Sequence, residues 1–179
     1  MPSSPGSRTT SHRRPGRPRA KSESTMTLLP LPLDAIEIGV HADTWRAAVT
    51  AAGDALHRSG ATEPEYTDRM IGVIADFGAY VVIAPGLALA HARPGPDVLV
   101  EGLSVVTLAE PVAFGHPHND PVSVVVGLAV RNGEDHLHFV AELANVFNDP
   151  LVIPAIAAAT DAETIRLLLG VNESHKAQQ

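Results

Sequence analysis

LSVVTLAEPV (residues 103–112) and VSVVVGLAVR (residues 122–131) are two neighbouring runs that decide the fold of this chain. Both are nearly continuous in apolar residues, without a regular alternation of polar and apolar side chains. Such runs are typical of strands that are covered on both faces, because a strand with one solvated face would alternate. Helices must provide that cover, so the two runs predict a layered α/β protein.

Two shorter runs of strand-forming residues lie upstream of this pair, and turn residues separate them from each other. They are YVVIAP (residues 80–85) and LALAHA (residues 87–92). The four runs predict about four strands. The expected architecture is a mixed sheet of about four to five strands, flanked by helices on both faces.

Apolar residues recur at helical spacing on both sides of the strand region. The expected N-caps are Asp43 for the first helix, Asp135 for the first helix after the strands, and Thr160 for the last helix. If Asp135 is the cap, His136 is the first helical residue. Two helices are expected before the strands and three after them, within residues 41–60, 62–78, 135–147, 149–159 and 160–170.

Composition and charge limit the classes of protein. The 179 residues are enough for one domain, and the low aromatic content of 4% leaves the core to Ala, Val, Leu and Ile. The formal net charge is -7, but residues 1–25 contain six basic residues and only Glu23 as an acid. That segment therefore carries about +5 and the remainder about -12. An acidic body argues against nucleic acid as a partner, because Lys and Arg supply most of that affinity.

The chain divides into three expected parts. Residues 1–25, rich in Ser, Arg and Pro, predict a disordered basic arm, although a true start at Met26 is equally open. Residues 26–172 predict one domain, and residues 173–179 a disordered tail. No run approaches the roughly 20 apolar residues of a membrane span.

The absence of cysteine excludes disulfides, thiolate metal sites and cysteine nucleophiles from this chain, and it is compatible with a cytoplasmic location. A Gly-x-Gly-x-x-Gly motif and a Walker loop are also absent from the sequence. We therefore expect no cofactor.

Five of the nine histidines lie between residues 91 and 138. His91 ends the predicted strand LALAHA, where it either packs against a loop, binds a metal or takes part in chemistry. His136 lies near the start of a predicted helix, where unpaired backbone N–H groups favour an anion. An ordinary solvated position in the first helical turn is equally open for His136.

The stretch FGHPHNDPV (residues 114–122) offers a metal alternative. His116, His118 and Asp120 match the start of the His-x-His-x-Asp-His pattern of zinc hydrolases. Pro121 stands where the final histidine belongs, so a loop of turn-forming residues is favoured and we expect no metal.

Three stretches together resemble the enzyme IIA domains of the mannitol/fructose type in the bacterial phosphoenolpyruvate-dependent sugar phosphotransferase system. They are APGLALAHARP (84–94), GLSVVTLAEPVAFGHPHNDPVSVVVGLAVRNGEDHLHFVAELANVF (102–147) and EPEYTDRM (63–70). The resemblance is greatest to the ascorbate branch and extends over about residues 30 to 170. It implies the type-2 enzyme IIA fold for the domain of residues 26–172.

The resemblance also implies a function. Such a domain is a cytoplasmic phosphoryl carrier that takes a phosphoryl group from HPr on a histidine and passes it to a cysteine of enzyme IIB, which serves the membrane enzyme IIC in sugar uptake. By the motif, His91 is the acceptor. His136 matches the second family histidine, which lies against the phosphorylated ring. Whether the domain forms a homodimer is left open.

The sequence departs from the family pattern at three points. Ala90 stands where a proline commonly precedes the acceptor histidine, and Val73 aligns with an arginine of mannitol-type members. Arg93 is the nearest candidate for binding the phosphoryl group in its place, although a solvated or carboxylate-paired role is equally open. Asp120 either orients a histidine or caps a turn. These departures leave a second reading, a regulatory enzyme-IIA-like module that senses phosphorylation and binds a target protein.

Overall fold

The two long apolar runs form the central strands of the structure, a computed structural model that describes residues 29–171. They are β4 (Gly102–Val112) and β5 (Val122–Ala129), which pair in an antiparallel manner. Both strands are buried along most of their length. The prediction of strands covered on both faces is confirmed.

Three shorter strands complete a mixed sheet in the order β1-β4-β5-β3-β2. β3 (Leu87–His91) runs parallel to β5, and β2 (Val82–Ala84) returns antiparallel to β3. β1 (Ile36–Val40) runs parallel to β4 at the opposite edge. The predicted α/β class is therefore confirmed. The sequence analysis missed β1, because this short edge strand is only partly covered and lacks a continuous apolar run.

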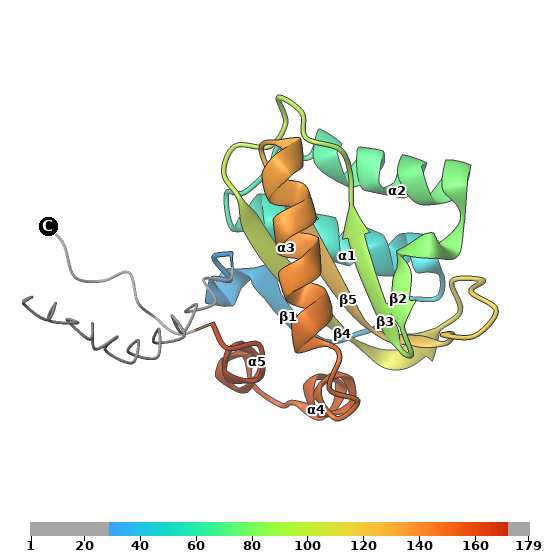
Figure 1. Cartoon of the computed structure of the whole chain (residues 1–179). Coiled ribbons are helices and arrows are strands. Elements are labelled where there is room, and N and C mark those ends of the chain that lie inside the picture. The colour runs from blue at the N-terminus through green and yellow to red at the C-terminus, as the bar shows by residue number, and fades with distance from the viewer. Residues whose placement is uncertain (1–28, 172–179) are drawn as a thin grey trace, which may run out of the picture.

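Helices cover both faces of the sheet (Figure 1). One face packs against α1 (Trp45–Arg58) and α2 (Glu65–Phe77), and the other packs against α3 (Gly133–Val146), α4 (Val152–Ala158) and α5 (Ala162–Leu168). Two short 3-10 turns, Leu33–Ala35 and Ala79–Val81, precede β1 and β2. The alternating residues of each strand divide between two apolar cores, as the pleat of a strand requires.

The predicted helix caps are wrong by a few residues. Thr44, not Asp43, caps α1, because its hydroxyl accepts a hydrogen bond from the backbone of Ala47. Asp161, not Thr160, caps α5. In both cases the capping side chain belongs to the last residue with an extended backbone, which lets it fold back over the first turn.

Gly127 in β5 allows α1 to approach the sheet closely. A Cβ atom at this position would lie 2.3 Å from Ser104 Oγ and 3.3 Å from the carbonyl oxygen of Ala52 in α1. Ser104 itself donates a 2.7 Å hydrogen bond to the Ala52 carbonyl. A glycine is therefore needed where helix and sheet meet.

Within residues 29–171, none of the helices combines the length and the apolar character that crossing a membrane requires. The predicted basic arm (1–25) and the predicted tail (173–179) lie outside the described residues.

Candidate functional site

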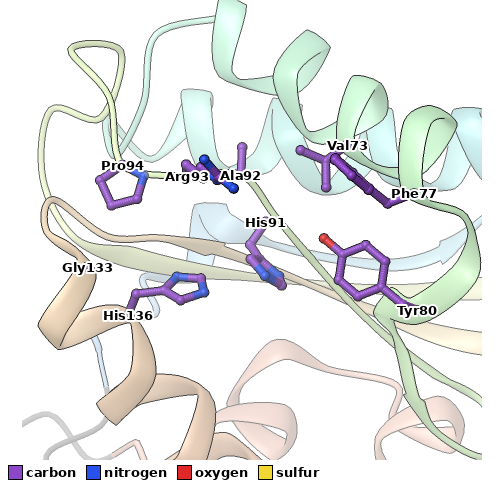
Figure 2. A pocket seen from close by; sticks show the side chains of 9 residues that line it. All are labelled: Val73, Phe77, Tyr80, His91, Ala92, Arg93, Pro94, Gly133 and His136. Atoms are coloured by element: carbon purple, nitrogen blue, oxygen red, sulfur yellow. The ribbon is translucent and has the colours of Figure 1, made fainter.

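His91 lies at the end of β3, where it pairs in register with Leu128 of β5. Its imidazole faces a cavity of about 730 Å³ between α2, the loop that follows β3, and the first turn of α3 (Figure 2). The cavity is lined by Val73, Phe77, Tyr80, His91, Ala92, Arg93, Pro94, Gly133 and His136. Three of the four site residues expected from the sequence, namely His91, His136 and Arg93, therefore meet at one place.

The two nitrogens of His91 have different surroundings. Nδ1 lies 2.9 Å from the carbonyl oxygen of Leu89. Because a carbonyl oxygen can only accept, Nδ1 carries the proton and Nε2 keeps its lone pair. Burial lowers the pKa of His91, against the opposing effect of the hydrogen bond to Leu89. The ring is therefore neutral near pH 7 and has one basic nitrogen available for reaction.

His136 is the residue that faces His91 from α3. The two ring centroids lie 4.8 Å apart, with 48° between the ring planes. Burial and the nearby His91 both lower the pKa of His136. Within the described part of the chain, the buried Nδ1 of His136 has no hydrogen-bond partner. The His136 side chain lines the cavity, so its ring can contact a group that enters there.

The first turn of α3 brings His136 to this position. Asn132, not Asp135 as predicted, caps the helix, because its backbone is extended and its Oδ1 accepts a hydrogen bond from the Asp135 backbone. His136 is consequently the fourth helical residue rather than the first. Gly133 lines the cavity, so the positive end of the helix dipole lies beside the two histidines. Such a helix end favours an anionic group.

The opposite wall of the cavity is apolar. Val73 and Phe77 of α2 and the adjacent Tyr80 form this wall (Figure 2), and Phe77 is 72% exposed. Val73 is apolar and brings no charge to the site. Arg93, two residues after His91, is the cationic side chain among the residues that line this cavity.

Tyr66 of α2 is a contact of the site that the sequence analysis did not single out. Its hydroxyl accepts a 3.1 Å hydrogen bond from the backbone N–H of Ala92 and donates a 2.7 Å hydrogen bond to the carbonyl of Leu128. The side chain is fully buried, and burial raises the pKa of Tyr66 to about 12. The only sequence signal was its place in the EPEYTDRM stretch.

Arg69, one turn further along α2, holds the loop that follows His91. Its Nη2 donates a 2.6 Å hydrogen bond to the carbonyl of Arg93, and its Nη1 forms a 2.5 Å ion pair with Asp97 Oδ1. This loop, which forms one side of the cavity, is therefore tied to α2 by charged and neutral contacts.

Asp120 orders a loop and is not among the residues that line the cavity. Its carboxylate accepts hydrogen bonds from the backbone N–H groups of Phe114, Gly115 and His116. The Nδ1 of His116 in turn accepts from the backbone of His118 and of Asn119. Among residues 29–171 no group of three or more His, Cys, Asp or Glu side chains is placed to hold a metal ion. The zinc-hydrolase pattern therefore does not assemble into a metal site.

Comparison with protein-family models gives a match over most of the chain. Residues 30–170 match the family described as the phosphoenolpyruvate-dependent sugar phosphotransferase system, EIIA 2. An ascorbate-specific PTS system EIIA component of Escherichia coli (strain K12) is 34% identical over 135 residues, which are 74% of this chain and 88% of that protein. The component of the same name from Salmonella choleraesuis (strain SC-B67) is 33% identical over 133 residues, 74% of this chain and 86% of that protein.

Solved structures give the same result. The crystal structure of IIA mannitol from Escherichia coli superposes with a TM-score of 0.70 and 30% sequence identity, covering 78% of this chain and 99% of that chain. An NMR structure of the mannitol enzyme IIA, in complex with phosphorylated enzyme IIB from the same organism, superposes with a TM-score of 0.72 and 28% identity. That match covers 81% of this chain and 100% of the other. The expected resemblance to mannitol-type and ascorbate-type enzyme IIA proteins is confirmed.

Proposed function

The chain belongs to the EIIA 2 family of the phosphoenolpyruvate-dependent sugar phosphotransferase system, and from this premise we propose that His91 accepts a phosphoryl group from phospho-HPr and passes it to a cysteine of enzyme IIB. The chain is a phosphotransferase of the relay type. One observation carries the assignment of His91: its Nδ1 is bonded to the Leu89 carbonyl, which leaves Nε2 as the free nitrogen of a ring that lines the cavity beside His136. The relay would serve uptake of an ascorbate-like sugar, in keeping with the names of two relatives that are 33% and 34% identical to this chain.

The geometry supports a direct in-line exchange. The Nε2 lone pair of His91 attacks the phosphorus of the donor phosphohistidine. The new P–N bond forms as the donor's P–N bond breaks, and the electron pair of the broken bond returns to the donor ring. The Leu89 carbonyl holds the Nδ1 proton and stabilises the positive charge that develops on the His91 ring.

His136 and Arg93 are proposed to bind the oxygens of the transferred group. In phosphoryl transfer the protein mainly positions the reactants and stabilises negative charge. His136 lines the cavity beside the His91 ring, and the start of α3 offers a favourable dipole. Arg93 offers a positive charge at the same cavity. His136 is thus a stabilising partner of His91 and not a second nucleophile.

The composition of the chain and the complex formed by a relative support the proposed partners. The 179 residues contain no cysteine, so the cysteine that receives the phosphoryl group lies outside them. The mannitol enzyme IIA forms a complex with phosphorylated enzyme IIB. We propose the same class of partner here, with HPr as donor, the membrane enzyme IIC as an indirect partner, and the cytoplasm as the location.

A reconstituted relay tests the proposal. With phosphoenolpyruvate, enzyme I and HPr, intact mass spectrometry should find one added phosphoryl group on the wild-type chain and none on His91→Ala. His136→Ala should still be phosphorylated, at a rate lower by about 10- to 100-fold, because one stabilising donor is lost. Phosphorylation of His91→Ala to the wild-type extent would contradict the assignment.

The alternative function, a regulatory module that binds a target protein, is supported by one specific observation, the apolar Val73 in the wall of the cavity. A module of that kind would accept the phosphoryl group but would not pass it on. Rapid loss of the label to the cysteine of an enzyme IIB encoded nearby supports the transport role, whereas a label that stays on His91 supports the regulatory one.

A further inference from the structure

Strands β3 and β5 cease to pair directly at His91 and Leu128, and a side chain stands between them at this point. The last pair in register is His91 with Leu128. Just beyond it, the Tyr66 hydroxyl accepts from the backbone N–H of Ala92 and donates to the Leu128 carbonyl. The hydroxyl therefore links a donor of one strand to an acceptor of the other, in place of a direct bond between the two strands.

The Tyr66 hydroxyl and its hydrogen bonds to the two strands form a bridge, which has few ways to rearrange. Tyr66 is fully buried, and its neighbours on α2, Met70 and Ile74, belong to the same apolar core. A buried N–H or carbonyl group that loses its partner is costly. Because burial raises the pKa of Tyr66 to about 12, its proton stays in place over the whole physiological range. The hydroxyl can therefore act as a permanent donor, and the Leu128 carbonyl at 2.7 Å is nearer to it than the Ala92 carbonyl at 3.3 Å.

Arg69 adds a second attachment on the same helix, one turn after Tyr66. Its guanidinium holds the Arg93 carbonyl and the Asp97 carboxylate. The loop also fits closely around it, since a Cβ atom on Gly95 would lie 2.5 Å from Arg69 Nη1. Two residues of α2 therefore fix the chain immediately after His91.

We propose that Tyr66 is a positioning residue for phosphoryl transfer, because its hydroxyl sets the separation of β3 and β5 at His91 and so aims the His91 Nε2 into the cavity, with Arg69 as its second anchor. The proposal rests on the proposed function of His91. Displacing a reacting atom by about 1 Å can cost about a hundredfold in rate. If the hydroxyl is removed, the ends of β3 and β5 can move together or apart. Either movement would turn the backbone at Ala92 and so displace the His91 ring.

Tyr66→Phe tests the proposal, with Ser104→Ala as the matched control. Ser104 is also fully buried, and its hydroxyl donates to the Ala52 carbonyl of α1 on the same face of the sheet, but this bond does not link β3 to β5. Each variant loses one buried hydroxyl. Single-turnover transfer from phospho-HPr gives the rate constant at saturating donor and the donor concentration at half-maximal rate, at a temperature where both variants are folded.

For Tyr66→Phe we expect the rate constant to fall at least about tenfold, with the half-maximal donor concentration unchanged within about twofold. Ser104→Ala should keep the wild-type rate constant even where it loses as much stability. A Tyr66→Phe variant that transfers at the wild-type rate would overturn the proposal, because the hydroxyl would then serve stability alone.

A second readout needs no phosphoryl donor. Imidazole ¹⁵N NMR should find the Nδ1–H tautomer of His91 in the wild type and in Ser104→Ala, and a mixture of tautomers in Tyr66→Phe. An unchanged tautomer together with an unchanged rate refutes the positioning role. Failure of the wild type to accept phosphate would instead refute the proposed function, and the NMR comparison would still test the position of the ring.

Arg69→Gln replaces Tyr66→Phe if the latter does not fold. The Arg69 side chain is 37% exposed, so the substitution is compatible with folding. It removes the contacts to Arg93 and Asp97, and we expect a several-fold lower rate constant at saturating donor. A wild-type rate constant in this variant would contradict the role of α2 in positioning His91.

Discussion

His91 has one nitrogen tied to its own strand and one open to the cavity, and the protonation state of the ring decides whether the second can react. Burial lowers the pKa of His91 and of His136, and the nearby His91 lowers the pKa of His136 further. The two rings therefore stay neutral at pH values at which an ordinary surface histidine begins to take up a proton. Attack on phosphorus needs this neutral form.

The lowered pKa values predict how stability depends on pH. Below the ordinary histidine value of about 6.5, the unfolded chain binds protons that the folded chain does not, so the free energy of unfolding rises with pH. The contribution is complete above about pH 6.5 and is lost as the pH falls through the folded pKa. Between about pH 7.5 and about pH 5, the free energy of unfolding measured by urea denaturation should therefore fall more in the wild type than in His91→Gln. Equal losses would mean that His91 titrates as it does in the unfolded chain.

At the scale of the elements, α2 contributes both the bridge behind His91 and the apolar wall in front of it. Tyr66 faces the core, whereas Val73 and the largely exposed Phe77 face the cavity. An exposed aromatic side chain at the edge of a reactive cavity is a suitable anchor for a partner protein. The same helix can therefore position the histidine and receive the donor.

Phe77→Ser should weaken docking without impairing the chemistry. We expect the donor concentration at half-maximal rate to rise about tenfold, while the rate constant at saturating HPr stays near that of the wild type. Leu151→Ser is the control. Leu151 is 74% exposed, compared with 72% for Phe77, but it does not line the cavity. Transfer kinetics over a range of HPr concentrations measure both quantities. A lower rate constant with unchanged donor dependence would place Phe77 in the chemistry instead.

The elements also show what the sequence could and could not predict. Continuous apolar runs predicted β4 and β5 correctly, because strands buried on both faces leave a local signal. The edge strand β1 was missed and the helix caps were misplaced, because a partly covered strand and a shift of a cap by one to three residues change the local pattern little. His91 and His136 were identified from the family resemblance. The role of Tyr66 had no local signal, since its hydroxyl contacts residues 26 and 62 positions away.

At the scale of the whole molecule, the cavity lies where the two helical layers meet beyond the end of β3. One wall comes from α2 in the first layer and the other from α3 in the second (Figures 1 and 2). The distance of each layer from the sheet therefore affects the width of the site. Gly127 helps to set that distance for the first layer, because the sheet and α1 come within contact there.

Gly127→Ala should destabilise the protein by about 1 to 3 kcal/mol, since the added methyl group would meet Ser104 Oγ at 2.3 Å and the Ala52 carbonyl at 3.3 Å. Removing the nearest obstacle should reduce the cost, so Gly127→Ala is expected to cost at least about 0.5 kcal/mol less in a Ser104→Ala background. Urea denaturation of the wild type, both single variants and the double variant measures this difference. Additive losses would show that the helical layer moves away to admit the methyl group. In that case the spacing of α1 from the sheet would be adjustable and would not constrain the width of the cavity.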